Sequence, residues 1–241
     1  MANDLFVELQ EKLEGKKVRI VFPEAYDERV LEAAVKLSAT SYVQPVLVGK
    51  KEKVEELAQP LFLNVSGIEF VDHENYEKYD EMVAKFVERR AGKVNEEKAR
   101  ELLQDVNYFG TMLVYMGEVE GLVSGAIHST GDTVRPALQI IKTKPGVSRT
   151  SGAFIMSRNA SRFIFADCAI NTSIDAQGLA EIAVESARTA KAFNINPKVA
   201  MLSFSTYGSA KTEETLKVAE ATRLVREKAP TLPVGGEMQF D

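Results

Sequence analysis

The sequence contains no tryptophan, a single cysteine and only two histidines among its 241 residues. One cysteine, Cys168, excludes an internal disulfide framework and is typical of proteins in a reducing compartment, so we expect a cytoplasmic location. The two histidines, His73 and His128, are too few and too far apart in the chain for a zinc site, so we expect no metal.

Long apolar runs and a strong basic excess are also lacking. No stretch reaches the roughly 18 apolar residues that a transmembrane helix needs, and no basic segment precedes an apolar one as in a secretory signal. We therefore expect no membrane partner. The formal net charge of −5 and the isoelectric point near 5.4 argue against a general nucleic-acid binder. A small anionic substrate is still compatible with this charge, because a few arginines can dominate one cleft.

Hydrophobic residues make up 45% of the chain, enough for one large domain or two modest ones. Short apolar runs alternate with longer segments of helical periodicity, which is typical of βα units around a mostly parallel sheet. This pattern predicts an α/β fold. In the first part of the chain we expect strands at 17–22, 45–49, 68–71 and 121–125, and helices at 4–14, 28–37, 51–57, 76–90, 96–103, 108–116 and 133–141.

Lys144, Pro145 and Gly146 interrupt the alternation, and we place a domain boundary there. Residues 1–144 are expected to form a first α/β domain and residues 145–241 a second one. In the second part we expect strands at 152–156 and 162–166 paired across a turn at 158–161, a helix at 175–193, a strand at 199–204 and a helix at 212–228. The chain stops at 236–241 without a closing helix, so the second domain is expected to be incomplete.

A polar loop, residues 124–136, leaves an expected strand and enters an expected helix. Ligands of open α/β sheets collect at such positions, and glycines there allow backbone amides to approach an anion. His128, Ser129, Thr130 and Arg135 are the candidate substrate-binding residues of this loop, with hydroxyl donors and a guanidinium for a phosphate or carboxylate. The alternative is that its hydroxyls only cap the following helix.

A second polar loop, residues 203–212, also lies between a strand and a helix. Ser205, Thr206 and Ser209 are its candidate substrate-binding residues, and a capped turn is the equal alternative. Neither the spacing of a Walker phosphate loop nor a G-x-G-x-x-G dinucleotide motif is present.

Three other groups of residues have both a functional and a structural interpretation. His128, Ser129 and Asp132 lack the sequence context of a hydrolase triad, which spatial geometry assembles rather than a local cluster. Cys168 has apolar neighbours that favour a buried, inert thiol over an acyl-accepting thiolate. Arg89 and Arg90 could bind phosphates or could simply compensate the C-terminal dipole of their helix.

Several stretches follow one another in an order that carries a family resemblance. They are 21–24 (VFPE), 86–90 (FVERR), 108–112 (YFGTM), 123–136, 139–143 (QIIKT), 165–167 (FAD), 199–206 (VAMLSFST), 208–211 (GSAK) and 236–241 (GEMQFD). On these stretches the chain resembles the phosphate acetyltransferases of the short, single-module type across essentially its full length.

The resemblance implies two α/β domains with a cleft between them, related in fold to the isocitrate and isopropylmalate dehydrogenases. It also implies a homodimer formed largely through the second domain. The implied substrates are coenzyme A or acetyl-CoA, acetyl phosphate and phosphate. In the implied reaction the CoA thiolate attacks the acetyl carbonyl within a ternary complex, without an acyl-enzyme. The family's substrate-binding arginines fall on Arg135 and Arg90, and the two polar loops are expected to face a shared cleft.

Two departures from the family pattern matter. Tyr207 stands where the family often has a lysine, so no cationic role passes to that position. The family's serine-arginine-glycine motif, and the aspartate proposed as base for the CoA thiol, have no counterpart before Asp241. No catalytic residue is therefore assigned, and a polypeptide ending there is expected to be inactive. The alternatives are a phosphate butyryltransferase and a non-catalytic remnant that binds a phosphorylated ligand.

Overall fold

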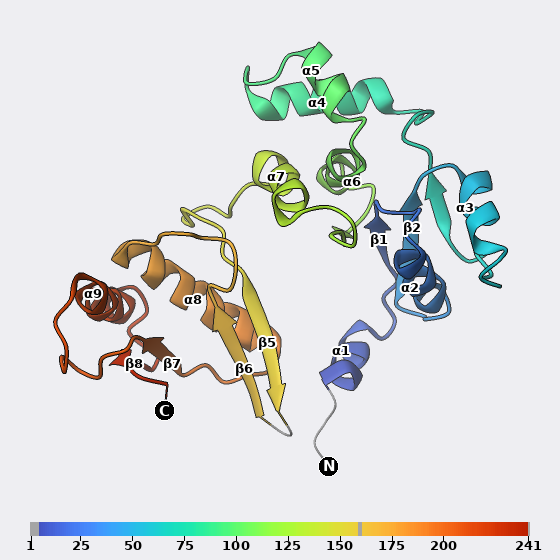
Figure 1. Cartoon of the computed structure of the whole chain (residues 1–241). Coiled ribbons are helices and arrows are strands. Elements are labelled where there is room, and N and C mark those ends of the chain that lie inside the picture. Colours follow the sequence, from blue (N-terminus) through green and yellow to red (C-terminus); the bar gives the residue numbers. More distant parts are fainter. Residues whose placement is uncertain (1–4, 159–160, 241) are drawn as a thin grey trace. The chain divides into compact units, whose positions relative to one another are not determined.

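The structure is a computed structural model that describes residues 5–158 and 161–240. It divides into two compact units, one within residues 5–142 and the other within residues 143–240, and each is described by itself (Figure 1). Asp4, residues 159–160 of the expected turn at 158–161, and Asp241 lie outside the described residues.

The first unit is built on a parallel sheet of four strands in the order β3-β2-β1-β4. This confirms the predicted parallel α/β arrangement. The strands are β1 (Val18–Phe22), β2 (Val43–Val48), β3 (Glu69–Val71) and β4 (Gly121–Leu122). The ladder between β1 and β4 is short, and its last hydrogen bond runs from the Val123 amide to the Val21 carbonyl. The strand expected at 121–125 therefore ends earlier, at Leu122.

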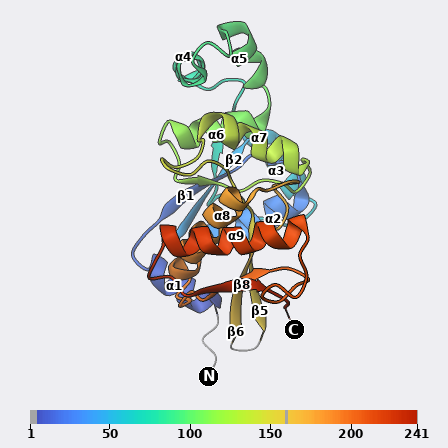
Figure 2. The same cartoon turned by 90° about the vertical axis from the view of Figure 1, so that its left-hand side faces the viewer.

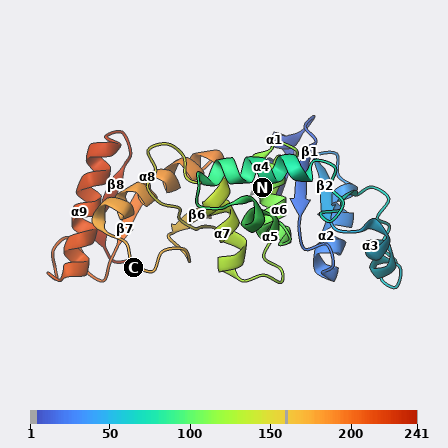
Figure 3. The same cartoon turned by 90° about the horizontal axis from the view of Figure 1, so that it is seen from above.

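Helices cover both faces of this sheet. The helices of this unit are α1 (Leu5–Leu13), α2 (Glu28–Ser38), α3 (Lys51–Ala58), α4 (Tyr79–Arg90), α5 (Glu96–Leu102), α6 (Val106–Tyr115) and α7 (Thr130–Ile140). Figures 1 and 3 show α3 and α6 on opposite sides of β1 and β2. The side chains of β1 alternate accordingly: Val21 packs among α4 and α6, and Phe22 packs against α2.

Two helix starts differ from the expected ones. Helix α4 begins at Tyr79 rather than at residue 76, because residues 76–79 close a turn in which the Tyr79 amide donates to the Tyr76 carbonyl. Helix α7 begins at Thr130 rather than at Thr133, because Ser129 supplies its N-cap. The second difference changes the position of a candidate residue, Arg135, within its helix.

Helix α6 lies close to the ends of β1 and β4 because Gly110 has no side chain. A Cβ at this position would come within 2.9 Å of Leu122 and 3.0 Å of Pro23. Phe109 and Met112, on the same helix, are fully buried in the core. Burying a side chain of this size contributes roughly 1.5–3 kcal/mol. The core therefore fixes α6 against the strand ends where the polar loop begins.

The second unit contains two separate two-stranded sheets and two helices. The sheets are β5 (Ala153–Arg158) with β6 (Ser161–Ala166), antiparallel, and β7 (Val199–Leu202) with β8 (Val234–Met238), parallel. The predicted strand pair is confirmed. The strand expected at 199–204 ends at Leu202, and strand β8 was not expected.

Helices α8 (Ala176–Ala192) and α9 (Glu213–Lys228) build the core of this unit with Met201 of β7. Figure 2 shows α9 running beside β8. A groove of about 560 Å³ between β6, α8 and β7 is lined by apolar side chains that include Phe165, Leu179 and Ile182. No helix within the described residues is both long and apolar enough to cross a membrane.

Candidate active site

In the sheet of the first unit, successive strands are added on one side of β1 and then on the other. The chain proceeds from β1 to β2 and β3 on one side, whereas β4 lies on the other side of β1. In open parallel sheets, the carboxyl ends of the strands at such a switch point form the usual ligand site. Glu24 follows β1, and residues 123–129 follow β4, so both segments leave the sheet at this point.

The carboxylate of Glu24 lies inside the loop that follows β4. Its Oε2 accepts hydrogen bonds from the amides of Gly125 (3.0 Å) and Ala126 (2.7 Å), and its Oε1 accepts from those of Ile127 and His128 (both 3.0 Å). The His128 ring adds a contact of 2.6 Å between Nδ1 and Oε1. Only 2% of the Glu24 side chain is exposed. The loop is therefore wound around one buried anion.

The amides that surround Glu24 also decide its charge. Burial alone raises the pKa of the carboxyl group, but the amides of Ile127, Ala126 and His128 and the His128 ring outweigh it and lower the pKa to about 2. Glu24 is thus ionised throughout the neutral range.

This arrangement corrects one expectation. We expected the backbone amides of the loop to approach an anionic ligand, but the amides of residues 125–128 donate to Glu24 instead. An internal carboxylate satisfies them without the cost of ordering a ligand. The amides of residues 125–128 are therefore not available to an anionic ligand.

Acid conditions should reveal the contribution of Glu24 to stability. Its pKa is lower in the folded protein, about 2, than the usual 4.5, so the unfolded chain takes up the proton first. The free energy of unfolding should fall by up to about 3 kcal/mol between about pH 4.5 and pH 2. Urea denaturation at several pH values measures this. Glu24→Gln should be less stable at neutral pH and lack this part of the pH dependence, and equal slopes in both proteins would contradict the assignment.

His128 lies at the end of the loop with its ring between the buried carboxylate and the surface. Its Nδ1 contacts Glu24, and 23% of the side chain is exposed. Within the described part of the chain no residue hydrogen-bonds to Nε2. The ring therefore has one nitrogen committed to the protein and one nitrogen free to meet a ligand.

Ser129 caps α7. Its Oγ accepts from the Asp132 amide (3.2 Å) and donates to the Asp132 carboxylate (2.7 Å). The capping alternative thus accounts for Ser129, although the side chain is exposed and could also meet a ligand. Thr130, the first residue of α7, is exposed as well.

Arg135 lies in the second turn of α7, not in the first turn as the expected helix start implied. The field of a helix terminus falls off within one turn, so the N-terminus of α7 has little effect on Arg135. The guanidinium lies 3.5 Å from Asp132 and 59% of the side chain is exposed. Such a surface pair is worth only about 0–1 kcal/mol, which leaves Arg135 available to a stronger anion.

Arg90 ends α4 and contacts the other end of α7. Its Nη1 donates to the Gln139 carbonyl at 3.1 Å, and its Nε is buried without a hydrogen-bond partner in the structure. Gln139 also accepts from the Tyr108 hydroxyl at 3.1 Å. Burial raises the pKa of Tyr108, and the cations Arg135 and Arg90 oppose this rise. Arg90 and Tyr108 thus both contact Gln139 of α7.

Arg89, by contrast, has a structural role. Its Nε and Nη2 donate to the carbonyls of Ile140 (2.5 Å) and Ile141 (2.8 Å) at the C-terminal end of α7. Arg89 therefore compensates the C-terminal dipole of a helix, as the structural alternative predicted. The helix is α7 rather than α4, which carries Arg89.

Sequence reasoning missed three residues of this site. Glu24 was noted only as part of a matching stretch, and Asn107 and Arg29 were not considered. The Asn107 side chain accepts from the Ser124 hydroxyl at 2.6 Å, and its own Nδ2 is buried without a partner in the structure. An acidic residue separated from an apolar strand by one proline was the available signal for Glu24.

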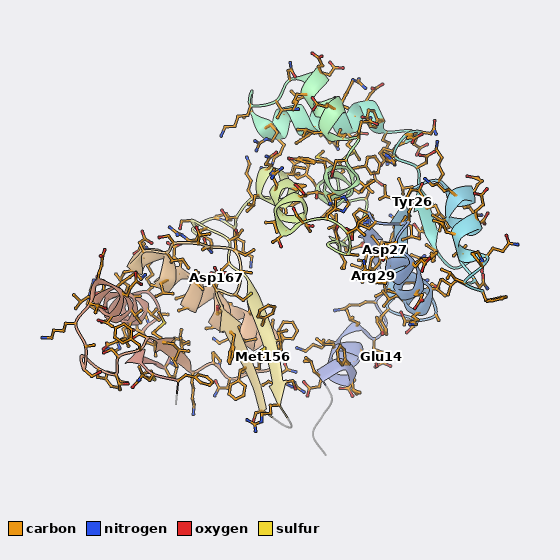
Figure 4. All side chains as sticks on the ribbon, viewed as in Figure 1. Glu14, Tyr26, Asp27, Arg29, Met156 and Asp167 are labelled. Atoms are coloured by element: carbon orange, nitrogen blue, oxygen red, sulfur yellow. The ribbon has the colours of Figure 1, made fainter. Side chains whose placement is uncertain are left out.

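Arg29 stands at the start of α2 and contacts the same loop. Its Nη2 donates to the Ala126 carbonyl at 2.8 Å and to Asp27 at 2.8 Å. Figure 4 shows Asp27 and Arg29 together where β1 leads into α2. The guanidinium is thus shared between an internal carboxylate and the loop that carries His128.

The second polar loop is also wound around a glutamate. Ser205 is fully buried, and its hydroxyl donates to Glu237 of β8 at 3.1 Å and accepts from the Ala210 amide at 3.0 Å. Glu237 accepts from the Gly208 amide at 2.5 Å as well. Ser205 therefore holds the loop through hydrogen bonds within the protein, and its expected contact to a substrate stays a prediction.

Thr206 and Ser209 are exposed. The Ser209 hydroxyl accepts from the Thr206 amide at 3.0 Å, and the Thr206 hydroxyl accepts from the Gln239 amide at 3.2 Å. Both residues thus remain candidates in a loop of their own, in the second unit. The first loop brings His128, Ser129 and Thr130 together, with Arg135 farther along α7.

No group of three or more histidine, cysteine, aspartate or glutamate side chains within residues 5–158 and 161–240 could hold a metal ion. Cys168 is half-buried rather than fully buried as expected, and its sulfur lies against the backbone of Gly152.

A parallel sheet of four strands, with helices on both faces and a polar loop at its switch point, defines an α/β protein. The model of the family described as phosphate acetyl/butaryl transferase matches residues 4–241. The chain belongs to this family.

Relatives that are named phosphate acetyltransferases support this family assignment. The phosphate acetyltransferase of Bacillus subtilis is 58% identical over 238 residues, which cover 99% of this chain and 74% of that protein. The phosphate acetyltransferase of Staphylococcus aureus N315 is 59% identical over 242 residues, with the same coverage of 99% and 74%. This chain thus spans about three quarters of the length of both relatives.

Solved structures give the same result. The EutD phosphotransacetylase from Staphylococcus aureus has a TM-score of 0.91 at 59% identity and is matched over 73% of its length by 99% of this chain. A phosphotransacetylase from Streptococcus pyogenes has a TM-score of 0.94 at 53% identity, over 98% of this chain and 73% of its own. A branched-chain phosphotransacylase from Enterococcus faecalis, at 15% identity and a TM-score of 0.57, shares the fold.

Proposed function

We propose that this protein catalyses the exchange of an acetyl group between coenzyme A and phosphate, in which acetyl-CoA and phosphate form CoA and acetyl phosphate. The observation that carries the proposal is identity of 58–59% over 99% of the chain to proteins named phosphate acetyltransferase. The site is compatible with it, because all substrates carry phosphate groups and the switch point of the first unit presents cationic and hydroxyl side chains.

In the proposed reaction the CoA thiolate attacks the acetyl carbonyl of acetyl phosphate directly. The carbon–sulfur bond forms, the bond to the phosphate oxygen breaks, and phosphate leaves. The half-buried Cys168 has no role in this scheme. Arg135 and Arg90 hold phosphate groups of CoA or of the acyl phosphate, and guanidinium groups suit this because they bind phosphate oxygens in pairs. His128, Ser129, Thr130, Thr206 and Ser209 are the proposed polar contacts to substrate.

The proposal includes the larger architecture. Two α/β domains enclose a cleft as in the isocitrate and isopropylmalate dehydrogenases, the two polar loops face that cleft, and the boundary lies near Lys144. The β5–β6 hairpin exposes Phe154 (56%) and Phe163 (50%), an apolar surface that supports a homodimer formed through the second domain. The single cysteine supports a cytoplasmic location.

The acyl group is acetyl rather than butyryl or branched-chain. The relatives at 58–59% identity are named for acetyl transfer, whereas the branched-chain enzyme shares only 15% of its residues with this chain. The test is the rate at which the full-length protein forms thioester from CoA with acetyl phosphate and with butyryl phosphate. A higher kcat/KM for butyryl phosphate, or no turnover of either, would refute the proposal.

A further inference from the structure

We propose that Glu24 is a positioning residue for acyl transfer, which holds His128 with Nδ1–H toward the buried carboxylate and leaves Nε2 to exchange a proton with the phosphate oxygen of the substrate. The inference rests on the proposed function for the identity of the substrate. The geometry of the two residues is independent of it.

The orientation of the ring follows from hydrogen-bond chemistry. The carboxylate of Glu24 can only accept, and four backbone amides and Nδ1 surround it, so the 2.6 Å contact requires a proton on Nδ1. A neutral ring with its proton on Nδ1 has a lone pair on Nε2. The low pKa of Glu24, about 2, keeps the carboxylate charged and able to stabilise the imidazolium form. The pair thus resembles a carboxylate–histidine dyad in its roles.

The surroundings favour a phosphate at Nε2. Ser129 and Thr130 follow His128 directly with exposed hydroxyls, and the N-terminus of α7 begins there. Arg29 contacts the same loop through the Ala126 carbonyl. The charged groups near the pair are the guanidinium of Arg29 with its partner Asp27, and Asp132 beyond Ser129.

The reaction needs one proton transfer to phosphate. When CoA attacks acetyl phosphate, the leaving oxygen takes a proton from Nε2 of the His128 imidazolium, so hydrogen phosphate leaves instead of the less stable trianion. The CoA thiol loses its proton to its own base, which releases the proton to water, and His128 takes up a proton from water to restore the imidazolium. In the opposite direction neutral His128 takes the proton of hydrogen phosphate as its oxygen attacks the thioester carbonyl, and the thiolate leaves.

Two substitutions of His128 separate this role from a structural one. Asparagine places its amide nitrogen near the position of Nδ1, so His128→Asn can keep the contact to Glu24 while it removes Nε2. Glutamine reaches the position of Nε2, so His128→Gln loses the contact to Glu24. In the full-length protein we expect His128→Asn to lower kcat about 10²- to 10⁴-fold, with an unchanged melting temperature. A purely structural histidine predicts the reverse, an active His128→Asn and a destabilised His128→Gln.

A spectroscopic measurement tests the positioning role without activity. With ¹⁵N-labelled histidine at about pH 9, nitrogen chemical shifts distinguish Nδ1–H from the Nε2–H form that histidine prefers in water. The protein has two histidines, and the signal that disappears in His128→Asn identifies His128. We expect Nδ1–H in the unmodified protein and Nε2–H in Glu24→Gln.

Failure of this inference can be distinguished from failure of the proposed function. An Nε2–H signal for His128 in the unmodified protein, or full activity of His128→Asn, would overturn the inference even if the protein transfers acetyl groups. An Nδ1–H signal in a protein that turns over no acyl phosphate would refute the proposed function and confirm only the orientation of His128. If Glu24→Gln does not fold, Glu24→Asp and the spectrum of the unmodified protein still decide the question of orientation.

Discussion

A polypeptide that ends at Asp241 should form acetyl-CoA from acetyl phosphate at a negligible rate. The matched relatives are longer, since this chain covers 74% of their length. By the family resemblance, the base for the CoA thiol and the serine and arginine that hold the reacting groups lie in the remainder. Loss of a positioned base alone costs about 10²- to 10⁴-fold, and loss of charge stabilisation adds to it.

The measurement is a thioester assay on a sample whose mass is verified. The matched control is the Staphylococcus aureus relative, assayed at full length and shortened to the segment that this chain matches. Both shortened proteins should be inactive beside an active full-length control. A rate typical of enzymes from residues 1–241 would show that the catalytic groups lie within them.

Arg135→Ala should lower kcat/KM substantially and leave the melting temperature nearly unchanged. The side chain is 59% exposed and its pair with Asp132, at 3.5 Å, contributes about 0–1 kcal/mol, so little stability depends on it. Loss of a charge-assisted contact to a substrate phosphate costs roughly 1.5–3 kcal/mol, or about 10- to 150-fold in kcat/KM. Steady-state kinetics and thermal unfolding of the full-length protein measure the two effects.

Two further variants are needed to interpret the kinetics of Arg135→Ala. Arg135→Lys should restore only part of the activity, because lysine lacks the paired donors of the guanidinium. Arg188→Ala is the matched control, because Arg188 is 65% exposed and pairs with a carboxylate three residues away on α8. Arg188→Ala should keep full activity. Unchanged kinetics in Arg135→Ala, or a loss explained by unfolding, would show that Arg135 is structural.

Much of the fold could be predicted from periodicity. The apolar runs at β1 and β2 and the amphipathic segments of α2, α8 and α9 were recognised because buried faces impose their spacing on the sequence. The exceptions were elements whose limits depend on distant partners. Strand β8, with Gly235 and Gly236, has little strand character of its own and forms because it pairs with β7.

The polar loop after β4 was predicted from the sequence, but its internal hydrogen bonds were not. A polar loop after a strand marks the carboxyl edge of a sheet, and His128 and Ser129 lie in such a loop, directly before Thr130 begins α7. The sequence does not show that Glu24, about one hundred positions earlier, satisfies the amides of that loop. Ser205 was likewise expected to meet a ligand, whereas a glutamate 32 residues later engages its hydroxyl.

The sequence by itself determined the α/β class, the family and the location of the polar loops, because these follow from local periodicity and from ordered motifs. Only the tertiary structure decided which polar groups remain free for chemistry. Hydrogen bonds between residues far apart in the chain consume the amides of residues 125–128 and the Ser205 hydroxyl, while Nε2 of His128 and the guanidinium of Arg135 keep access to the surface. Such pairing depends on which strand ends meet at one edge of a sheet, and the order β3-β2-β1-β4 is set by packing of the whole unit.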